Sequence, residues 1–278
     1  MCATGRASRP LMNGSPKGSR QRLDALLVER GLAESRSRAE ALILSGTVRV
    51  GDRVVTKAGS RIAADEPLSV ETGQRFVSRA GEKLDAALDE FGLDVEGSSC
   101  LDAGASTGGF TDVLLRRGAS RVLAVDVGYG QFAWLLRNDP RVTVMERTNV
   151  RRLAGGDLPF GPDLLVADLS FISLAVALER LFSTTPSLRE AVLLVKPQFE
   201  AGPGAVGRGG LVRDPQVHAS VILSVARSFR AIGFGTVGVA RGALAGRKSG
   251  NVEYPVHLVR GAGSTVDESR VGEVVGGG

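Results

Sequence analysis

The stretch Leu101-Asp102-Ala103-Gly104-Ala105-Ser106-Thr107-Gly108-Gly109-Phe110 decides the fold of this chain. An apolar run ends in an acid, a glycine-rich turn follows, and the next residues have helical character. Because glycine has no Cβ, the three glycines of the turn let the backbone approach a ligand closely. The N–H groups at the start of the helix would then point at that ligand. The stretch therefore predicts a nucleoside-cofactor site at a strand end of an α/β domain.

A second acidic strand end narrows the choice of cofactor. The apolar run 122–125 is followed by Asp126, about twenty residues after the turn begins, where an acid suits a ribose hydroxyl pair. The turn reads Asp-x-Gly-x-x-x-Gly-Gly and departs from the dinucleotide pattern Gly-x-Gly-x-x-Gly. This spacing favours S-adenosylmethionine, with its ammonium near Asp102 and its ribose near Asp126. A dinucleotide is the alternative.

Apolar strands alternate with helical segments along the rest of the chain. Such alternation predicts a Rossmann-like α/β domain, in which helices cover both faces of a mostly parallel seven-stranded sheet. A helix over 81–91 precedes the first strand. The predicted strands are 99–103, 121–126, 141–146, 163–168, 191–196, 235–240 and 255–259.

The N-terminal fifth of the chain is strongly basic. Residues 1–61 contain twelve Lys or Arg and five Asp or Glu, whereas the whole chain has a net charge of only +5. This concentration of positive charge indicates a polyanionic partner, most often a nucleic acid. A basic face that is merely solvated is the alternative.

Two helices and a hairpin are predicted in this basic segment. Leu23, Leu26 and Leu27 share one face of a helix over 20–33. Ser37 and Glu40 fit a capping box before a second helix, and the alternating residues 48–55 predict a hairpin around a Gly-Asp turn. The predicted division is a disordered basic tail (1–19), a small α+β module (20–66), a linker (67–78), the α/β domain (79–260) and a disordered tail (261–278).

Composition excludes several classes of protein. No apolar run approaches the roughly 18 residues that span a membrane, and the first twenty residues lack the apolar core of a signal peptide. Two cysteines cannot build a disulfide framework, and together with two histidines they provide no metal-ligand cluster. We therefore expect a cytoplasmic protein without a metal or a membrane span.

Two further strand ends carry charged residues. Asp168 follows the apolar run 164–167, and Lys196 follows the run 191–195. Ligands of open α/β sheets lie beyond such carboxyl ends, and a lysine is rarely buried without a partner. A purely structural ion pair between the two residues is the alternative. Lys83 and Glu253, taken singly, read equally well as surface charges.

Taken together, Lys83, Asp168, Lys196 and Glu253 resemble the Lys-Asp-Lys-Glu tetrad of the FtsJ class of ribose 2′-O-methyltransferases. The basic module, with its core at 36–43, resembles the S4 type of RNA-binding domain. The chain as a whole resembles the TlyA family of ribosomal RNA methyltransferases, sometimes labelled haemolysins. Five motifs carry this resemblance: 102–110, Asp126-Val127-Gly128-Tyr129-Gly130-Gln131, Ala167-Asp168-Leu169-Ser170-Phe171-Ile172-Ser173, Lys196-Pro197-Gln198-Phe199-Glu200 and Ser249-Gly250-Asn251-Val252-Glu253-Tyr254.

The resemblance implies a set of site residues. The tetrad would be catalytic, and arginines of the basic module would contact RNA phosphates. The implied cofactor-binding residues are Asp102, Gly104, Ser106, Thr107, Gly108, Gly109, Phe110, Asp126, Asn149 and Asp168. The implied RNA-binding residues are Arg20, Arg22, Arg36, Arg38, Arg49 and Arg53. Phe76, Phe110, Phe132 and Trp134 are expected in the core or the connector rather than against a base.

The implied reaction is S-adenosylmethionine-dependent 2′-O-methylation of cytidine in 16S or 23S ribosomal RNA. Lys196 would act as the general base, and the target must be RNA because DNA lacks the 2′-hydroxyl. Two other functions remain open at this point: a non-catalytic RNA-binding factor of ribosome assembly, and a membrane-lytic haemolysin.

Overall fold

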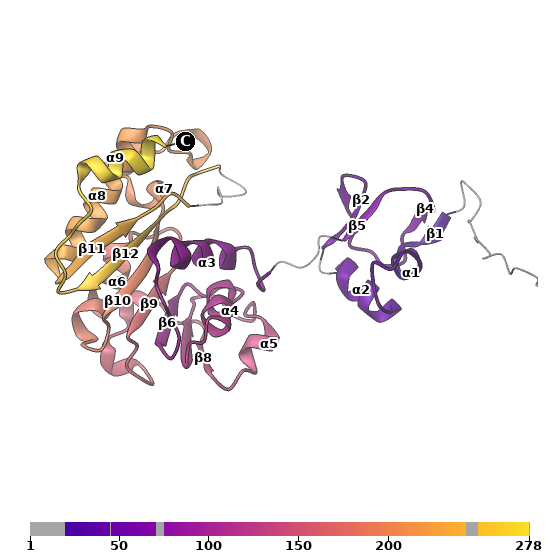
Figure 1. Ribbon diagram of the computed structural model, residues 1–278, viewed down its shortest axis with the longest axis horizontal. Helices are drawn as coiled ribbons and strands as arrows, with labels where there is room; N and C mark the ends of the chain where they lie inside the picture. The colour runs from indigo at the N-terminus through magenta and orange to yellow at the C-terminus, as the bar shows by residue number, and fades with distance from the viewer. Residues whose placement is uncertain (1–19, 45, 71–74, 243–249, 278) are drawn as a thin grey trace, which may run out of the picture. The chain divides into compact units, whose positions relative to one another are not determined.

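The computed structural model describes residues 20–44, 46–70, 75–242 and 250–277. The chain divides into two compact units, residues 1–74 and 75–278 (Figure 1). The predicted tail over 1–19 lies outside the described residues. Among the described residues, no helix is long and apolar enough to cross a membrane.

The N-terminal unit is a small α+β module, as the sequence predicts. Its core contains Leu23 and Leu27 from the first helix, Ala39 and Ile43 from the second, and strand residues that include Val48. A two-stranded sheet (β1-β4) and a three-stranded sheet (β3-β2-β5) accompany the two helices. The elements are β1 (Arg20–Arg22), α1 (Leu23–Glu29), α2 (Arg36–Leu44), β2 (Val48–Val50), β3 (Arg53–Val54), β4 (Arg61–Ala63) and β5 (Leu68–Val70).

Three local predictions for this unit are wrong. Residues 20–22 form β1 rather than helix, because they pair with β4, which lies far along the chain. Ser35, not Ser37, caps α2 by accepting the N–H of Arg38 at 3.2 Å. Residues 68–70, assigned to the linker, form β5 and pair with β2. Strand pairing between distant segments decides the first and third cases, and local sequence gives no direct signal of it.

The second unit is built on a seven-stranded sheet of order β11-β12-β10-β9-β6-β7-β8. The five strands from β10 to β8 are parallel, and β12 runs antiparallel to both of its neighbours. All seven predicted strands are present, within one or two residues of their predicted ends. They are β6 (Ser99–Ala103), β7 (Arg121–Val125), β8 (Val142–Met145), β9 (Leu164–Ala167), β10 (Glu190–Val195), β11 (Phe234–Val239) and β12 (Tyr254–Arg260).

Helices cover both faces of this sheet and form two cores (Figure 1). Strand β10 shows the alternation: Ala191, Leu193 and Val195 face one core, whereas Val192 and Leu194 face the other. One core packs against α3 (Ala80–Phe91), α4 (Gly109–Arg116) and α5 (Trp134–Arg137). The other packs against α6 (Leu174–Thr184), α8 (Pro215–Ala231) and α9 (Glu268–Gly276). Short helices fill the connections: η1 (Val150–Arg152), η2 (Gly155–Asp157), α7 (Pro197–Glu200), η3 (Pro203–Ala205) and η4 (Arg208–Gly210).

The C-terminal segment is not the predicted disordered tail. Asp267 accepts the N–H of Arg270 at 2.9 Å and so caps α9. Val271 and Val275, one helical turn apart, are buried in the core that includes α8. The sequence interpretation missed this helix because the segment is rich in glycine. An apolar pair at positions i and i+4 is nevertheless a signal of an amphipathic helix.

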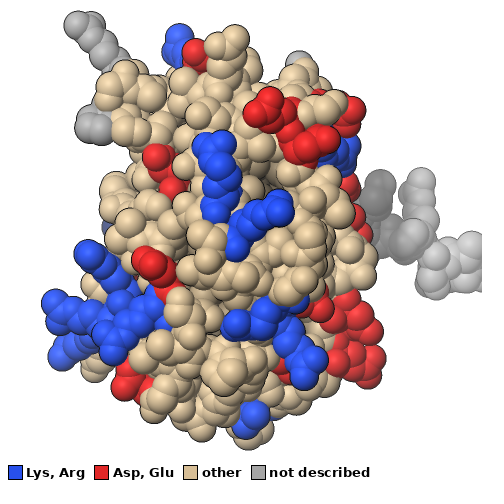
Figure 2. Space-filling view, turned by 90° about the vertical axis from the view of Figure 1, so that its left-hand side faces the viewer, with Lys and Arg blue, Asp and Glu red and all other residues tan. Residues whose placement is uncertain are grey.

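Figure 2 shows one face of the second unit, on the side where α8 and β11 lie in Figure 1. Lys and Arg side chains stand there in separate groups, with acidic groups and broad uncharged areas between them. A continuous basic surface is therefore not a property of this face, as far as the described residues go.

Substitution of Val271 tests the packing of α9. The side chain is fully buried, so Val271→Ala should lower the free energy of unfolding of the second unit by about 1–2 kcal/mol. Ser269→Ala, at an exposed position of the same helix, is the matched control. Urea unfolding would measure both, and equal stability of the two variants would contradict the assigned packing.

Candidate active site

Two adjoining cavities lie beyond the carboxyl ends of the central strands. They have volumes of about 390 and 360 Å³, and both are lined by Gly104, Ser106, Asp168 and Ser170. The first extends along Asp126 and Asn149. The second extends along Ser78, Thr107, Phe110 and Lys196. The cavities therefore open at the predicted edge of the sheet and include most of the predicted cofactor residues.

The four tetrad residues meet beside the second cavity, although they come from four separate segments. Lys196 Nζ lies 2.5 Å from Asp168 Oδ1, and Lys83 Nζ lies 3.8 Å from Asp168 Oδ2. Lys83 also donates a hydrogen bond of 2.6 Å to Glu253 Oε2. Two lysine amino groups and two carboxyl groups thus form one network, in which Asp168 is shared by both lysines. The convergence that the sequence predicts is present in the structure.

Lys196 is held in place from several sides. Only 8% of the surface of Lys196 is exposed, and Nζ donates a hydrogen bond to Ser170 Oγ at 3.1 Å. The ring of Phe199 lies 5.8 Å from Nζ, which is within the range of a cation–π contact. Burial of a lysine is costly unless the charge is paired and hydrogen-bonded, and Asp168 and Ser170 supply both. The amino group is therefore fixed at the mouth of the cavity rather than free to move.

Gly104 brings the turn against the strand that carries Asp168. Its φ of +85° lies in the left-handed region, and a Cβ there would lie 2.7 Å from the carbonyl oxygen of Asp168. Ser106, two residues further along the turn, also has a positive φ, of 49°, and donates its N–H to Asp126 Oδ2 at 2.8 Å. The turn is thus tied to the ends of two neighbouring strands, and a side chain at position 104 would separate it from one of them.

The other two glycines of the turn are required by packing against neighbouring segments, a reason that the sequence interpretation did not give. A Cβ on Gly108 would lie 2.5 Å from Leu136 of α5. A Cβ on Gly109 would clash with Ser78 and with the N-terminal end of α3. Neither glycine lines the two cavities. The sequence shows that small residues are needed at these positions, but only the packed helices reveal which neighbour requires them.

Asp102 lies beneath the turn instead of on the cavity wall. It is fully buried, and its Oδ2 accepts the N–H and the hydroxyl of Thr111 at 3.0 and 2.7 Å. Oδ1 has no hydrogen-bond partner among the described residues. Burial is the largest cause that raises the pKa of Asp102 to about 7, and the Thr111 bonds oppose it. The predicted direct contact between Asp102 and a cofactor ammonium does not match this geometry, because the carboxylate faces α4.

Asp126 and Asn149 line the first cavity, as predicted. The second oxygen of Asp126 accepts the N–H of Gly128 at 2.6 Å, so the carboxylate orders the backbone on both sides of the cavity. Asn149 Oδ1 accepts the N–H of Arg151 and caps η1. Both side chains are therefore positioned by bonds from the protein's own backbone N–H groups while they line the cavity.

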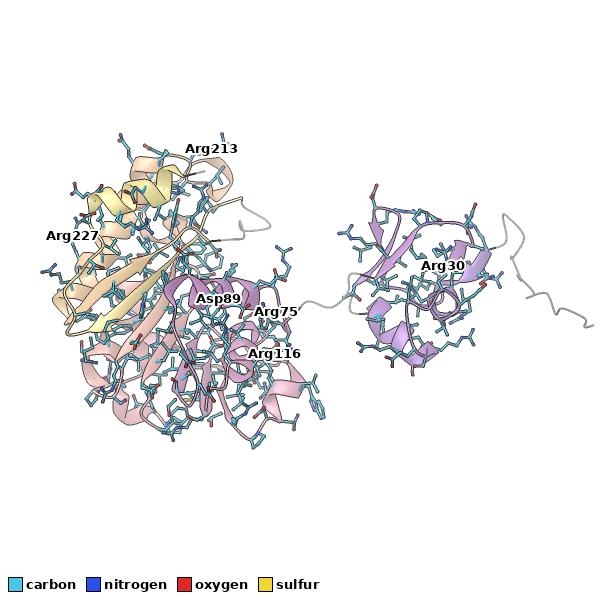
Figure 3. All side chains as sticks on the ribbon, viewed as in Figure 1. Arg30, Arg75, Asp89, Arg116, Arg213 and Arg227 are labelled. Carbon is cyan, nitrogen blue, oxygen red and sulfur yellow. The ribbon has the colours of Figure 1, made fainter. Side chains whose placement is uncertain are left out.

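Residues 75–78, which the sequence assigns to a linker, belong to the second unit. Phe76 is buried against Gly81 of α3, and the Val77 N–H donates to Asp112 of α4 at 2.8 Å. Arg75 pairs with Asp85, and the guanidinium groups of Arg75 and Arg116 both lie over the Phe76 ring. Figure 3 shows the two arginines at the same end of the second unit. This anchoring places Ser78 on the wall of the second cavity.

Several residues beside the site were not predicted. Ser170 binds Lys196, and Phe171 lies at the first cavity with 90% of its surface exposed. Phe171 has a φ of +65°, which is unusual for a residue with a side chain. Trp134, expected in the core, is 73% exposed on α5. The repeated exposure of aromatic side chains cannot be derived from sequence, because an apolar residue in a helical or turn segment is normally buried.

The arginines of the N-terminal unit differ in how free their charges are. Arg36 and Arg38 are exposed on α2 and form no ion pair with any residue that the structure describes. Arg22 pairs with Asp24 at 2.6 Å, and Arg53 pairs with Glu66 at 3.3 Å. Arg20 is exposed on β1, and Arg49 donates to the Asp52 carbonyl at 3.1 Å. Arg36 and Arg38 thus present two exposed guanidinium groups on one helix, α2.

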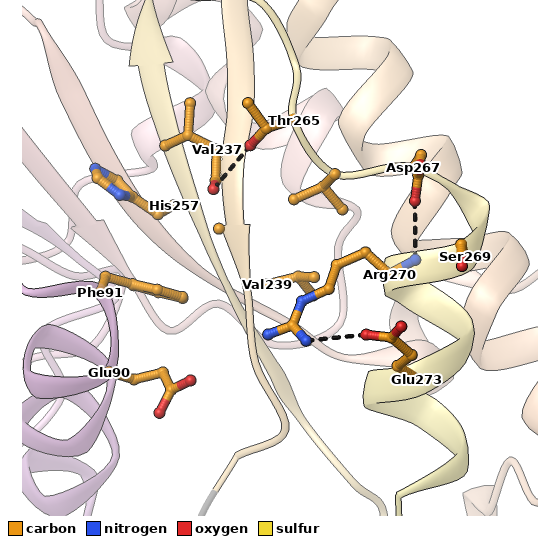
Figure 4. Close-up of a pocket in the computed structure, with 12 residues that line it drawn as sticks. Glu90, Phe91, Val237, Val239, His257, Thr265, Asp267, Ser269, Arg270 and Glu273 are labelled. Atoms are coloured by element: carbon orange, nitrogen blue, oxygen red, sulfur yellow. Dashed lines mark hydrogen bonds and ion pairs between the residues drawn. The ribbon is translucent and has the colours of Figure 1, made fainter.

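A third cavity, of about 670 Å³, lies between the end of α3, β11 and α9 (Figure 4). Its polar groups are engaged with one another: Arg270 pairs with Glu273 at 3.1 Å, and the Thr265 hydroxyl donates to the Val237 carbonyl. None of the predicted site residues lines it. Within the described part of the chain, no group of three or more His, Cys, Asp or Glu could hold a metal ion.

Comparison with known proteins identifies the family. The FtsJ-like methyltransferase family matches residues 76–260, and the S4 domain matches residues 21–67. The chain is 52% identical to the 16S/23S rRNA (cytidine-2′-O)-methyltransferase TlyA of Mycobacterium tuberculosis, over 84% of this chain and 88% of that protein. The chain belongs to the TlyA family. The resemblance inferred from the five sequence motifs is confirmed, and the second unit is an FtsJ-like methyltransferase domain preceded by an S4 domain.

Two other relatives extend the comparison. Hemolysin A of Brachyspira hyodysenteriae is 39% identical over 86% of this chain and 99% of its own. A solved structure from Streptococcus thermophilus, described as a candidate hemolysin, is 38% identical with a TM-score of 0.71, over 93% of this chain and 95% of that one. The two-domain architecture therefore recurs among relatives with either kind of name.

The buried carboxyl of Asp102 predicts a pH dependence of stability. Because its pKa is raised in the folded protein, the folded state binds more protons than the unfolded state between about pH 4 and pH 7. This contribution to the free energy of unfolding is complete below pH 4 and is lost as the pH rises through 7. Asp102→Asn keeps an acceptor for Thr111 and removes the titration, so it should gain stability relative to wild type between pH 5 and pH 8. Urea unfolding of both proteins at pH 5 and pH 8 measures the difference in stability between variant and wild type. The same difference at the two pH values would contradict the raised pKa of Asp102.

Proposed function

We propose that this protein transfers a methyl group from S-adenosylmethionine to a ribose 2′-hydroxyl of ribosomal RNA, at cytidine, the nucleoside named for its M. tuberculosis relative. The observation that supports this most strongly is the tetrad on the wall of the second cavity. A buried lysine amino group at 2.5 Å from a carboxylate, beside a cavity, provides a fixed site for proton transfer from a hydroxyl.

The two adjoining cavities suit the proposed cofactor. Asp126 and Asn149 would bind the ribose and neighbouring groups in the first cavity, and the turn residues Ser106 and Thr107 would bind the amino-acid portion near the second. Gly104 leaves room at the junction, where a Cβ would displace the strand end. Asp102 supports the turn from below through Thr111 and lines neither cavity. When bound, S-adenosylmethionine supplies a methyl group that a sulfonium sulfur has already activated.

Lys196 takes the proton of the attacking hydroxyl. In its neutral form the amino group accepts that proton as the ribose 2′-oxygen bonds to the methyl carbon and the bond from this carbon to sulfur breaks. Asp168 and Ser170 hold Nζ in one place, so the geometry of the transfer is set before the RNA binds. The resulting ammonium is stabilised by the Asp168 carboxylate.

Lys83 and Glu253 complete the charge balance of the site. Glu253 is 6% exposed and binds Lys83, which in turn lies near Oδ2 of Asp168, whereas Lys196 lies near Oδ1. Lys83 thereby orients Asp168, and Glu253 orients Lys83. We assign these two residues to positioning and to electrostatic support, and Lys196 to the proton transfer itself.

The RNA contacts are divided between the two units. Exposed Arg36 and Arg38 of α2 bind phosphates and so position the substrate without sequence preference. Phe171, exposed at the first cavity, offers a stacking face for a base turned out of its helix. A ribose hydroxyl can reach Lys196 only when the nucleotide enters the cavity, and stacking on an aromatic ring would hold it there.

The two alternative functions lack a comparable structural basis. A non-catalytic assembly factor has no need for a buried lysine with a carboxylate partner beside a cofactor-sized cavity, since such burial is costly. The same holds for a lytic protein, whatever the names of some relatives. Action on ribosomal RNA would take place in the cytoplasm, which we propose as the location of this protein.

Substitution of Lys196 tests the proposed chemistry. Lys196→Ala should reduce methyl transfer to ribosomal subunits by at least roughly 100-fold, because general-base catalysis is lost. Lys196→Arg keeps the positive charge and the Asp168 partner but cannot lose its proton, so it should be as inactive as Lys196→Ala. Calorimetry with S-adenosylmethionine is the control, since binding should persist in both variants. Transfer by Lys196→Arg at the wild-type rate would rule out the base assignment.

Substitution of the α2 arginines tests the RNA interface. The double variant Arg36→Gln, Arg38→Gln should weaken RNA binding at low salt and reduce the slope of log affinity against log salt by about 2. Filter binding or fluorescence anisotropy over a salt series measures this slope. Arg227→Gln, an exposed arginine on α8 of the other unit, is the matched control and should leave the slope unchanged. A slope that does not change in the double variant would remove α2 from the interface.

A further inference from the structure

Glu200 is the last residue of the motif that begins with Lys196, and the proposed chemistry does not use it. It ends the short helix α7. Its Oε1 accepts the N–H of Leu174 at 2.8 Å, and its carboxylate is also bound by the side chain of Ser173. Leu174 is the first residue of α6, whose own N-cap residue, Ser173, makes no capping bond with its side chain. A carboxylate from another segment therefore caps α6.

The capped helix begins directly after the loop that carries Asp168, Ser170 and Phe171. This loop is already attached to Lys196 at its first part, through the Asp168 ion pair and the Ser170 hydrogen bond. The rings of Phe171 and Phe199 pack with their centroids 4.9 Å apart. Glu200 adds the attachment at the far end of the loop. The loop after β9 is thus joined at both ends to the segment that follows β10. That segment begins with Lys196, the proposed base.

The backbone of this loop requires such support. A left-handed φ at Phe171 is unfavourable for a residue with a side chain, and it persists only where neighbouring structure holds it. Phe171 is 90% exposed, so burial of its own ring contributes little to holding it. Burial is the largest cause of the raised pKa of Glu200, and the bonds from Leu174 and Ser173 oppose that rise. The helix dipole places partial positive charge at the N-terminal end of α6. A partly buried carboxylate at that end stabilises it more than a fully exposed one would.

We propose that Glu200 is a positioning residue for methyl transfer, which holds the loop 168–173 against Lys196 by capping α6. It contacts neither the cofactor nor the RNA. Through this cap it keeps Asp168 at the base and Phe171 at the cavity mouth. This inference rests on the proposed function, because it assigns the loop its importance from the reaction.

Three variants test the proposal in the full-length protein. Glu200→Ala removes the cap and should lower kcat/KM for RNA by at least tenfold, because the loop that lines both cavities and holds Lys196 loses one of its attachments. Glu200→Gln keeps an acceptor oxygen for Leu174 and should stay within threefold of wild type. Glu190→Ala removes a carboxylate that binds His257 at the opposite end of β10, and serves as the control for a general loss of stability. Its methyl transfer should match wild type.

A double-variant cycle separates positioning from a merely structural effect. If Glu200 acts through the loop, Glu200→Ala in a Phe171→Ala background should raise the KM for RNA much less than it does alone. Hydrogen exchange should also increase at 168–174 and not in α8. If Glu200→Ala fails to fold, Glu200→Asp, which shortens the side chain, replaces it in the same measurements.

The outcomes are distinct. Wild-type activity in Glu200→Ala, equal losses in Glu200→Ala and Glu200→Gln, or additive effects in the cycle would each overturn the positioning role and leave the proposed function intact. Absence of methyl transfer to ribosomal RNA by the wild-type protein would instead overturn the proposed function. Unchanged exchange at 168–174 in Glu200→Ala would overturn the capping argument in either case.

Discussion

The sharing of one carboxylate by two lysines is the constraint on which the rest of the structure depends. Asp168 lies within ion-pair distance of both Lys196 and Lys83, and Glu253 balances the second lysine. Charges removed from water are costly unless they are paired in good geometry, so none of the four can be moved independently. The parallel sheet satisfies this constraint by delivering Asp168 and Lys196 from neighbouring strands, while α3 and β12 supply the other two.

Close packing around the glycine turn serves the same constraint. Gly104 lets the turn lie directly against the Asp168 strand end, and Gly109 lets α4 approach the start of α3 and Ser78. A side chain at either position would push apart segments that meet at the site. Asp102 supports the arrangement from below through Thr111, and its other oxygen has no hydrogen-bond partner among the residues that the structure describes. The cavity is thus a consequence of packing, and the polar groups on its wall are held by backbone bonds.

Most of the architecture could be predicted from sequence, and the failures have identifiable physical causes. The strands of the large sheet were predictable because their runs are apolar on both faces, as buried parallel strands require. Strand β5 was missed because three residues give little periodic signal and are stabilised by pairing with β2. The helix α9 was missed because glycines obscured its Val271–Val275 pair. The exposure of Phe171 could not be predicted from sequence, because it depends on whether other segments of the folded chain cover the ring.

The sequence by itself determined the family, the two-domain organisation and the identity of the four charged residues, because motifs and periodicity are properties of the chain order. Only the tertiary structure decided the roles of single side chains. In the structure, Asp102 is buried away from the cavity and Glu200 caps the start of α6. Gly108 and Gly109 pack closely against α5 and the start of α3. Each of these depends on a contact between segments that are distant in sequence. Such contacts are set by how helices and strands pack, and the local pattern of residues does not contain them.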